Sequence, residues 1–309
     1  MKNKVNFDVL GFGAVAVDDL VYVDAYPPPD AKLSVLRSER QCGGLTATAL
    51  VAAARLGSRC AYAGVLGADD LSNYAAQRMR EEGIDLTHLC QRPAARTIHS
   101  FIVVDVAKST RNIFANEIGF VGADPDWPEA EVIRASRVVL VDHFGLPGMI
   151  RAARLARESR IPVVADIEQA SGKDFAELLS LADHLILSES VVPALTGQAD
   201  PAAATQALWV ADRRAVVITC GNQGCWYLGQ GISPSPVHQK AFAVKTVDTT
   251  GCGDVFHGAY ASALARGAAL SECIRFASAA AALKATQPGG QSGIPNCQTV
   301  DAFLRNHEP

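Results

Sequence analysis

Apolar residues between positions 137 and 229 fall into short runs separated by longer amphipathic segments. The short runs predict strands buried on both faces, and they span 138–142, 162–166, 184–187, 215–219 and 224–227. The longer segments predict helices at 147–159, 174–181 and 200–212. Strands that alternate with helices indicate a parallel sheet covered on both faces and joined by right-handed crossovers.

The N-terminal third adds strands of a different kind. Residues 7–17 are almost continuously apolar and predict a buried first strand with a glycine turn. Alternating apolar and polar residues predict strands with one exposed face at 18–26, 97–105 and 110–115. An alanine-rich segment from Cys42 to Gly57 predicts a helix, and it is followed by a predicted strand at 60–67 and a helix that ends near Gly83.

The densest group of chemically informative residues lies at 247–267. The alternating run at 242–247 predicts a strand, and small apolar residues predict a helix from 254 to 266. Gly-Cys-Gly at 251–253 lies between them, where glycines let the backbone approach a ligand and turn its N–H groups outward. Because a helix N-terminus adds partial positive charge, this junction predicts an anion site suited to a phosphate.

Asp254 is unusual beside such a site, because a carboxylate and a phosphate repel each other. Two interpretations are open. Asp254 either caps the helix, as aspartate often does, or acts as a general base that accepts the proton of an attacking hydroxyl. The glycines and the run Asp248-Thr249-Thr250 before them favour the general base. His257 lies three residues further along and so on nearly the same helix face, where a packing role is the simpler interpretation.

Asp18 and Asp19 follow the predicted first strand, at the edge where parallel sheets bind ligands. Residues 11–16 also fit the pattern G-x-G-x-x-G/A of dinucleotide-binding proteins, but that pattern requires a helix directly after it. The following segment alternates as a strand and ends in the prolines 27–29. We therefore exclude a dinucleotide site and keep Asp18 either as a ligand-binding residue or as an ordinary loop cap.

Composition narrows the function class. The chain has 309 residues, of which 49% are hydrophobic, so it can bury a large core. A net charge of −4 gives no reason to expect nucleic acid or an anionic membrane as a partner. The eight cysteines form no Cys-x-x-Cys pair and no zinc-type spacing with histidine. We expect a soluble cytoplasmic protein with reduced thiols, without a membrane span.

Two stretches carry a resemblance to a known family. Residues 248–258, Asp-Thr-Thr-Gly-Cys-Gly-Asp-Val-Phe-His-Gly, resemble the signature D-T-x-G-A-G-D-x-F-x-G of the ribokinase-like (PfkB) carbohydrate kinases, with Cys252 in place of alanine. Residues 43–57 resemble the family's N-terminal signature, with Thr48 in place of the usual sugar-binding asparagine. The resemblance implies a three-layer α/β/α sandwich, one domain over 1–309, and a small β-sheet lid with strands within about 18–37 and 97–117.

The resemblance also implies roles for individual residues. Asp254 would be the general base, and the amides of Gly251, Cys252 and Gly253 would stabilise the transferred phosphoryl group. The sugar would contact Asp18, Gly43, Gly44, Thr48 and Arg111, although Arg111 could equally be an exposed hairpin residue. ATP would lie along Ser188, Thr219, Gly221, Gly224, Thr249 and Ser278. A monovalent cation such as K⁺ would bind near Asp248, Thr250 and Gly289.

Mg²⁺ is the least defined of the implied cofactors. The family motif N-x-x-E is replaced by Ser188-Glu189-Ser190-Val191. Either Glu189 acts from a shifted position, or the ion is held by phosphates and water alone, as its reluctance to lose water permits.

The implied function is phosphorylation of a sugar by ATP, with a homodimer formed through the lid. The C-terminal tail and Thr48 are most similar to sulfofructose kinases, yet Asp142-His143-Phe144-Gly145 provides no arginine for a sulfonate, so the sugar stays open. A nucleoside kinase on the same scaffold and a non-catalytic sugar-binding regulator are the alternatives.

Overall fold

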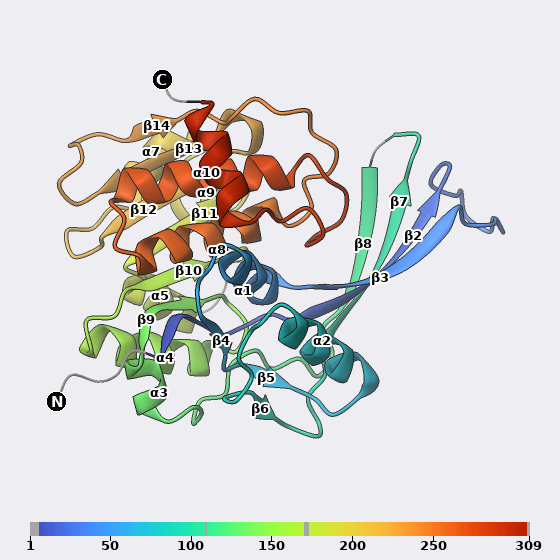
Figure 1. The fold of residues 1–309 in the computed structure, drawn as a ribbon, viewed down its shortest axis with the longest axis horizontal. Helices are drawn as coiled ribbons and strands as arrows, with labels where there is room; N and C mark the ends of the chain where they lie inside the picture. The colour runs from blue at the N-terminus through green and yellow to red at the C-terminus, as the bar shows by residue number, and fades with distance from the viewer. Residues whose placement is uncertain (1–5, 109, 170–172, 308–309) are drawn as a thin grey trace.

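A computed structural model describes residues 6–108, 110–169 and 173–307 of the chain. Its centre is an eight-stranded sheet in the order β14-β13-β12-β11-β10-β9-β1-β4 (Figure 1). The strands from β4 to β12 pair in parallel, and β13 and β14 are added antiparallel at one edge. Their bounds are β1 Phe7–Gly11, β4 Cys60–Tyr62, β9 Ser136–Val141, β10 Val163–Asp166, β11 His184–Ser188, β12 Ala215–Thr219, β13 Cys225–Gly229 and β14 Val237–Gln239.

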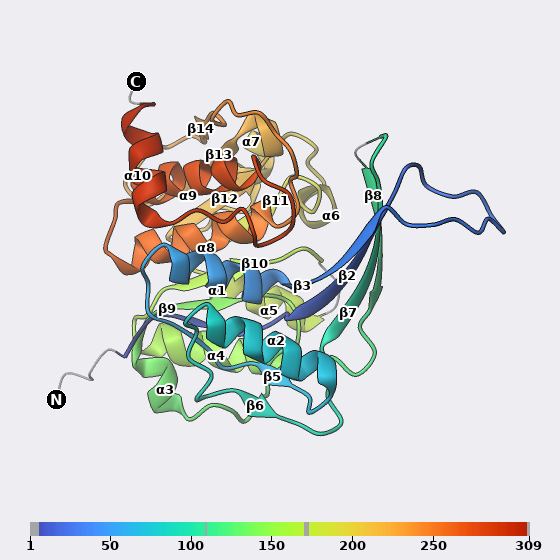
Figure 2. The same ribbon diagram turned by 45° about the vertical axis from the view of Figure 1, so that its right-hand side comes forward.

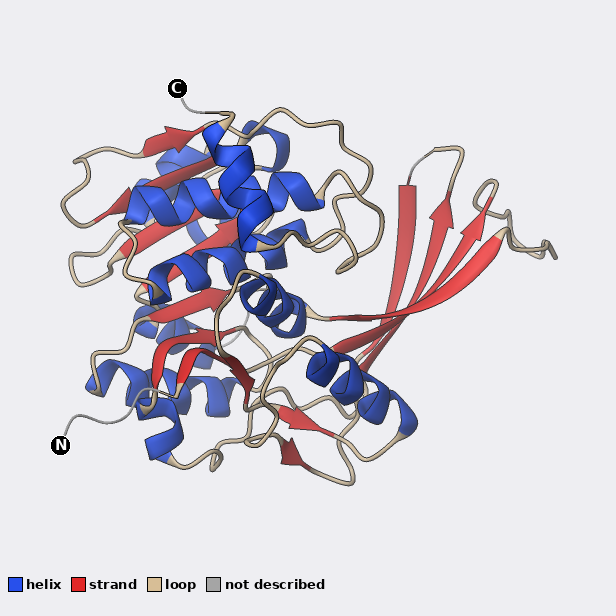
Figure 3. Ribbon diagram, in the orientation of Figure 1, coloured by secondary structure: helices blue, strands red, loops and turns tan. Residues whose placement is uncertain are grey.

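Helices cover both faces of this sheet (Figure 3). One face packs against α1 Leu45–Arg55, α2 Asp70–Glu81, α8 Cys252–Ala265, α9 Leu270–Lys284 and α10 Cys297–Arg305. The other packs against α3 Ala130–Arg134, α4 Leu146–Glu158, α5 Lys173–Leu181, α6 Val192–Thr196 and α7 Pro201–Ala207. Consecutive strand residues alternate between the two cores: Val138 and Leu140 face the first, Val139 and Val141 the second. The predicted α/β/α sandwich is confirmed.

A second sheet of four strands projects from this body (Figure 2). Its order is β3-β2-β7-β8, with bounds β2 Ala16–Val23, β3 Arg37–Gly43, β7 Ile98–Asp105 and β8 Thr110–Asn116. We call this sheet the lid. Two of its strands were expected within 18–37, but β3 lies almost wholly beyond residue 37 and runs directly into α1. A short pair, β5 Val65–Leu66 and β6 Cys90–Gln91, completes the strands of the described residues.

Several local expectations were wrong. No strand forms at 242–247, because the N–H of Val247 donates to the carbonyl of Ala285 at the end of α9 and Phe242 packs on Phe303 of α10. Helix α8 starts two residues before the predicted position, and α7 ends at Ala207 instead of 212. The short helices α3 and α6, strand β14 and helix α10 were not anticipated.

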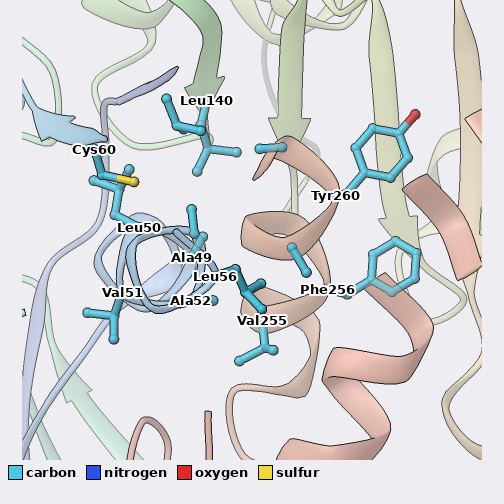
Figure 4. Packing of buried hydrophobic residues seen from close by; sticks show 14 of the residues in the cluster. Ala49, Leu50, Val51, Ala52, Leu56, Cys60, Leu140, Val255, Phe256 and Tyr260 are labelled. Atoms are coloured by element: carbon cyan, nitrogen blue, oxygen red, sulfur yellow. The ribbon is translucent and has the colours of Figure 1, made fainter. Parts of the chain in front are cut away.

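Helices α1 and α8 meet closely over the first core, and this contact positions both of their N-termini. Figure 4 shows the two helices side by side, with Ala49 and Ala52 of α1 near Val255 of α8, while Phe256 and Tyr260 point to the other side of α8. The approach depends on Gly258, where a Cβ atom would lie 2.0 Å from the carbonyl oxygen of Ala49. The obstacle is backbone, so it cannot rotate away.

Gly258→Ala should therefore destabilise the protein by about 1–3 kcal/mol, the usual range for overpacking a core. The measurement is the urea midpoint of unfolding. Gly253→Ala is the matched control, because Gly253 lies in the same helix with no atom within 4 Å of its ideal Cβ position. Equal midpoints for the two variants would contradict the close contact between α1 and α8.

Candidate active site

Acidic side chains gather where the parallel strands end. Asp166 is the last residue of β10, Asp142 follows β9, Asp18 lies in lid strand β2, and Asp254 is in the first turn of α8. The negative charges of Asp166, Glu168, Asp18 and Asp142 all act on Asp254. Residues from four separate parts of the sequence thus form one carboxylate cluster at the carboxyl edge of the sheet, where ligands of such sheets bind.

The first turn of α8 is open toward solvent. Gly251 precedes the helix with a left-handed φ of 74° and no side chain caps it. The N–H groups of Gly251, Gly253 and Asp254 have no hydrogen-bond acceptor among the described residues. The N–H of Cys252, in contrast, donates to the carbonyl of Thr249 at 3.2 Å. The predicted anion hole must be corrected accordingly: Cys252 does not offer its amide, and Asp254 does.

Asp254 is not the helix cap. Its position is the third of α8, and Gly251 occupies the capping position. Burial, followed by the charges of Asp166, Glu168, Asp18 and Asp142, raises the pKa of Asp254 well above the usual range of aspartate. A carboxyl group whose pKa lies closer to neutrality is a better proton acceptor for an alcohol than an ordinary aspartate.

His257 fixes the first turn of α8 from inside the core. It is buried, and its Nδ1 lies 2.8 Å from the carbonyl oxygen of Gly253 and 3.3 Å from Oδ2 of Asp166. Its Nε2 lies 3.2 Å from the carbonyl oxygen of Ile186 in β11. Burial lowers the pKa of His257, although these carbonyl contacts oppose the shift. The packing interpretation of this histidine agrees with these contacts.

Asp18 is partly buried beneath the lid. It pairs across the lid sheet with Ser100, and burial raises its pKa although the Ser100 hydroxyl opposes the shift. Gly43 leaves room for the carboxylate, because a Cβ there would lie 2.2 Å from Asp18 Oδ2. Gly44 turns the chain into α1 with a φ of 94°. Gly43 therefore leaves room for the Asp18 carboxylate, and Gly44 permits the turn into α1.

Thr48 and Arg111 reach the site from different elements. Thr48 is buried in α1, and its hydroxyl accepts a hydrogen bond from Gln291 Nε2 at 3.2 Å. Arg111 lies at an exposed position of lid strand β8, and its positive charge lowers the pKa of both Cys252 and Lys284.

The expected nucleotide residues lie along the same edge of the sheet. Ser188 and Thr219 end the neighbouring strands β11 and β12 and are paired in register. A tight turn follows, in which the N–H of Cys220 bonds to Gly224 O and that of Gly224 to Gly221 O. Ser278 in α9 lies beside the Cys225 thiol of β13, and Thr249 precedes the turn into α8. Ser188, Thr219, Gly221 and Gly224 thus lie at adjacent strand ends, and Ser278 lies beside the first residue of β13.

Asp248, Thr250 and Gly289 also come together. Oδ1 of Asp248 accepts hydrogen bonds from the amide and hydroxyl of Thr250 at 2.8 and 2.7 Å, and Oδ2 accepts one from the amide of Gly289 at 2.9 Å. The ammonium of Lys284 donates to the backbone carbonyl of Asp248 at 3.0 Å. The three residues predicted to bind a cation thus meet beside a cationic side chain of the chain itself.

Three residues of this region were not singled out from the sequence. Asp142 is fully buried and accepts hydrogen bonds from Ala14 N, Thr46 Oγ1 and Phe144 N, and burial raises its pKa to about 7. Asp166 and Asp142 could have been found as acids at strand ends. Lys284 could have been found as a single charge at the end of an otherwise apolar alanine-rich helix.

Comparisons with known proteins agree on one family. Residues 8–297 match the family described as pfkB family carbohydrate kinase. Ribokinase of Haemophilus influenzae is 30% identical over 95% of this chain and 97% of its own length. Probable fructokinase-4 of Arabidopsis thaliana is 26% identical over 97% of each chain.

Solved structures show the same fold. A crystal structure from Agrobacterium tumefaciens superimposes with a TM-score of 0.90 at 28% identity, over 96% of this chain and 97% of that one. Arabidopsis thaliana ribokinase complexed with ribose and ATP gives a TM-score of 0.83 at 25% identity, over 99% of each chain. In the part of the chain that the structure describes, no helix has the length and apolar character needed to cross a membrane.

Proposed function

Because the chain belongs to the pfkB family of carbohydrate kinases and is a sugar kinase, we propose that Asp254 is its general base. In this proposal, a single catalytic domain transfers the γ-phosphoryl group of ATP to a hydroxyl of a sugar or sugar derivative. The observation that carries it is the pairing of a carboxylate of raised pKa with free amides in the same helical turn.

The amides of Gly251, Gly253 and Asp254 bind the transferred phosphoryl group and stabilise the charge that develops on it. The partial positive charge at the start of α8 adds to this effect. Asp254 accepts the proton as the sugar oxygen attacks in line. Supplying both functions from one helix turn keeps their separation constant, and correct positioning of reacting groups is a large part of catalysis.

ATP lies along the carboxyl edge of β11 and β12 in this proposal. Its phosphates extend along Ser188, Thr219 and the turn from Gly221 to Gly224 toward Thr249. Its adenine ring lies near Ser278. The related Arabidopsis ribokinase was crystallised with ribose and ATP, which supports the same pair of ligands here.

Mg²⁺ would arrive on the ATP phosphates. Among the described residues, no group of three or more acidic, histidine or cysteine side chains could hold a metal ion alone. Mg²⁺ commonly uses few protein ligands together with phosphates and water. Glu189, exposed directly after β11, would be its protein ligand in this proposal. The ion would neutralise charge on the phosphates.

The sugar occupies the space between the lid and α1. Asp18 accepts hydrogen bonds from its hydroxyls, Arg111 closes the site from the lid, and Gly43 and Gly44 leave room. Thr48 lines the pocket from α1, with its hydroxyl already bound to Gln291. A bound K⁺ is not part of the proposal, because Gly289 offers an N–H donor and Lys284 already supplies a positive charge.

We further propose that two copies associate through the lid. Phe101 and Phe114, which are paired across β7 and β8, are 50% and 53% exposed, which is unusual for large apolar residues on neighbouring strands and typical of an interaction surface. Sedimentation of wild type and Phe114→Asp tests this: the proposal requires a dimer that the substitution dissociates, and a monomeric wild type contradicts it.

The deciding experiment for the activity measures ADP release with MgATP across ketoses, aldoses and nucleosides. The proposal predicts turnover with at least one sugar well above the nucleosides. Preference for a nucleoside would indicate a nucleoside kinase. Sugar binding without ADP release would indicate a non-catalytic regulator.

A further inference from the structure

Lys284 is a fully buried basic side chain near the site. It is the last residue of α9 and has 0% exposure. Its ammonium has one acceptor within hydrogen-bond distance, the backbone carbonyl of Asp248 at 3.0 Å. A charge removed from water is costly unless it is paired. Its position therefore needs a reason beyond packing.

The charges around Lys284 supply a partner. Burial lowers its pKa, the groups of Cys252, Asp248 and Asp254 raise it, and Arg111 lowers it. For the Asp248 carboxyl, burial works toward a higher pKa, but the hydrogen bonds from Thr250 and Gly289 and the Lys284 charge bring it below the usual range. Lys284 and Asp248 thus form a pair at the base of the loop that leads into α8, joined directly by the hydrogen bond from the ammonium to the Asp248 backbone carbonyl.

The pair organises two loops. Asp248 ties Thr250 on its own loop to Gly289 on the loop after α9. From there the second loop reaches the sugar side of the site, where Gly290 N bonds to Gln41 Oε1 of the lid and Gln291 bonds to Thr48. The first loop continues into the free amides of Gly251 and Gly253. The Lys284 ammonium therefore bonds to the residue, Asp248, that connects the loop before α8 with the loop on the sugar side of the site.

A bound alkali cation does not fit here. Such an ion needs several inward-facing oxygens, as hard cations do. The carbonyl of Ala285 accepts from the amides of Val247 and Asp248 at 2.7 and 3.1 Å, and Gly289 presents an N–H to Asp248. The carbonyl of Asp248 already accepts from Lys284. The carbonyls of Ala285 and Asp248 are therefore already engaged, and the ammonium that bonds to Asp248 is covalently part of the chain.

We infer that the Lys284 ammonium is a built-in monovalent cation, which holds the 248–251 and 289–291 loops in place and makes the kinase independent of added K⁺. Lys284 is thus a positioning residue. This inference rests on the proposed function for its kinetic readout, and the stability readout below is independent of any activity.

The first test uses the wild-type protein. Its kcat and urea midpoint should be the same, within about twofold for the rate, in 100 mM choline chloride and in 100 mM KCl, at matched ionic strength. Activation by K⁺ of tenfold or more, or a K⁺-specific rise in the midpoint, would overturn the inference. This arm requires no variant to fold.

The second test uses Lys284→Ala, which removes the charge and opens space for an ion. In choline chloride we expect kcat/KM to fall by roughly 10- to 100-fold, as for loss of a charged hydrogen bond. K⁺ or ammonium should restore part of the rate and raise the urea midpoint. Lys245→Ala, at an exposed position in the same connection, is the control and should show neither effect.

Wild-type rates and midpoints retained by Lys284→Ala in choline chloride would overturn the inference. A decrease in the rate and urea midpoint of Lys284→Ala that neither K⁺ nor ammonium reverses would also overturn it. If the wild type shows no kinase activity at all, the proposed function fails, while the cation dependence of the two midpoints still decides the role of Lys284.

Discussion

Asp254→Asn should lower kcat for sugar phosphorylation by about 10²–10⁴-fold, the usual contribution of a general base. Asparagine keeps the size of the side chain but cannot accept the proton of the attacking hydroxyl. The amides of Gly251 and Gly253 are unchanged, so MgATP should bind with nearly the same affinity. Steady-state kinetics and calorimetric titration with MgATP measure the two effects separately.

The stability of Asp254→Asn serves as its control. Asp166, Glu168, Asp18 and Asp142 all act unfavourably on a negative charge at residue 254, so a neutral side chain there should leave the urea midpoint unchanged or raise it. A variant that is well folded, binds MgATP and still turns over at a rate close to that of the wild type would exclude Asp254 as the base.

Asp18→Asn should have the second-largest effect, a decrease of roughly 10- to 100-fold in kcat/KM for the sugar. The amide cannot accept as many hydrogen bonds from sugar hydroxyls as the carboxylate, and polar groups of a binding site that lose their partners weaken binding strongly. The KM for ATP should stay the same, because Asp18 lies in lid strand β2, whereas Ser188 and Thr219 are the last residues of β11 and β12 in the central sheet.

Asp19→Asn provides a matched control from the next residue of the same strand. Because successive strand residues point to opposite faces, Asp19 faces away from the site and binds Arg40 and His99 instead. Its substitution should leave the sugar KM within about threefold of wild type, as is usual for surface pairs. Equal losses for the two variants would show that the effect of Asp18 is structural.

Periodicity and motifs predicted the parts of the molecule that are determined locally. The strands β9 to β12 are buried on both faces, so each appears in the sequence as a short, nearly continuous run of apolar residues. The glycine loop before α8 could be predicted because Gly251, Cys252, Gly253 and Asp254 are consecutive in the sequence. The predicted residues Ser188 and Thr219 meet in register because parallel strands bring their ends together.

The rest depends on contacts between distant segments. The alternation at 242–247 suggested a strand, but its Val247 amide pairs with Ala285. The pairing of Lys284 with Asp248 joins residues 36 positions apart. Sequence separation of this kind leaves no periodic signal.

The most direct test of Asp254 as the base is the pH dependence of kcat/KM for the sugar, measured for wild type and for Asp254→Asn at saturating MgATP. The base acts only when deprotonated, and its pKa is raised, so the wild-type rate should fall as the pH decreases through a value clearly above about 4, the range of an ordinary aspartate. Titration of the nucleotide affects both proteins, so it cancels in the ratio of wild-type kcat/KM to that of Asp254→Asn. We predict that this ratio decreases as the pH falls. A ratio that stays constant down to pH values of about 4 would contradict the account.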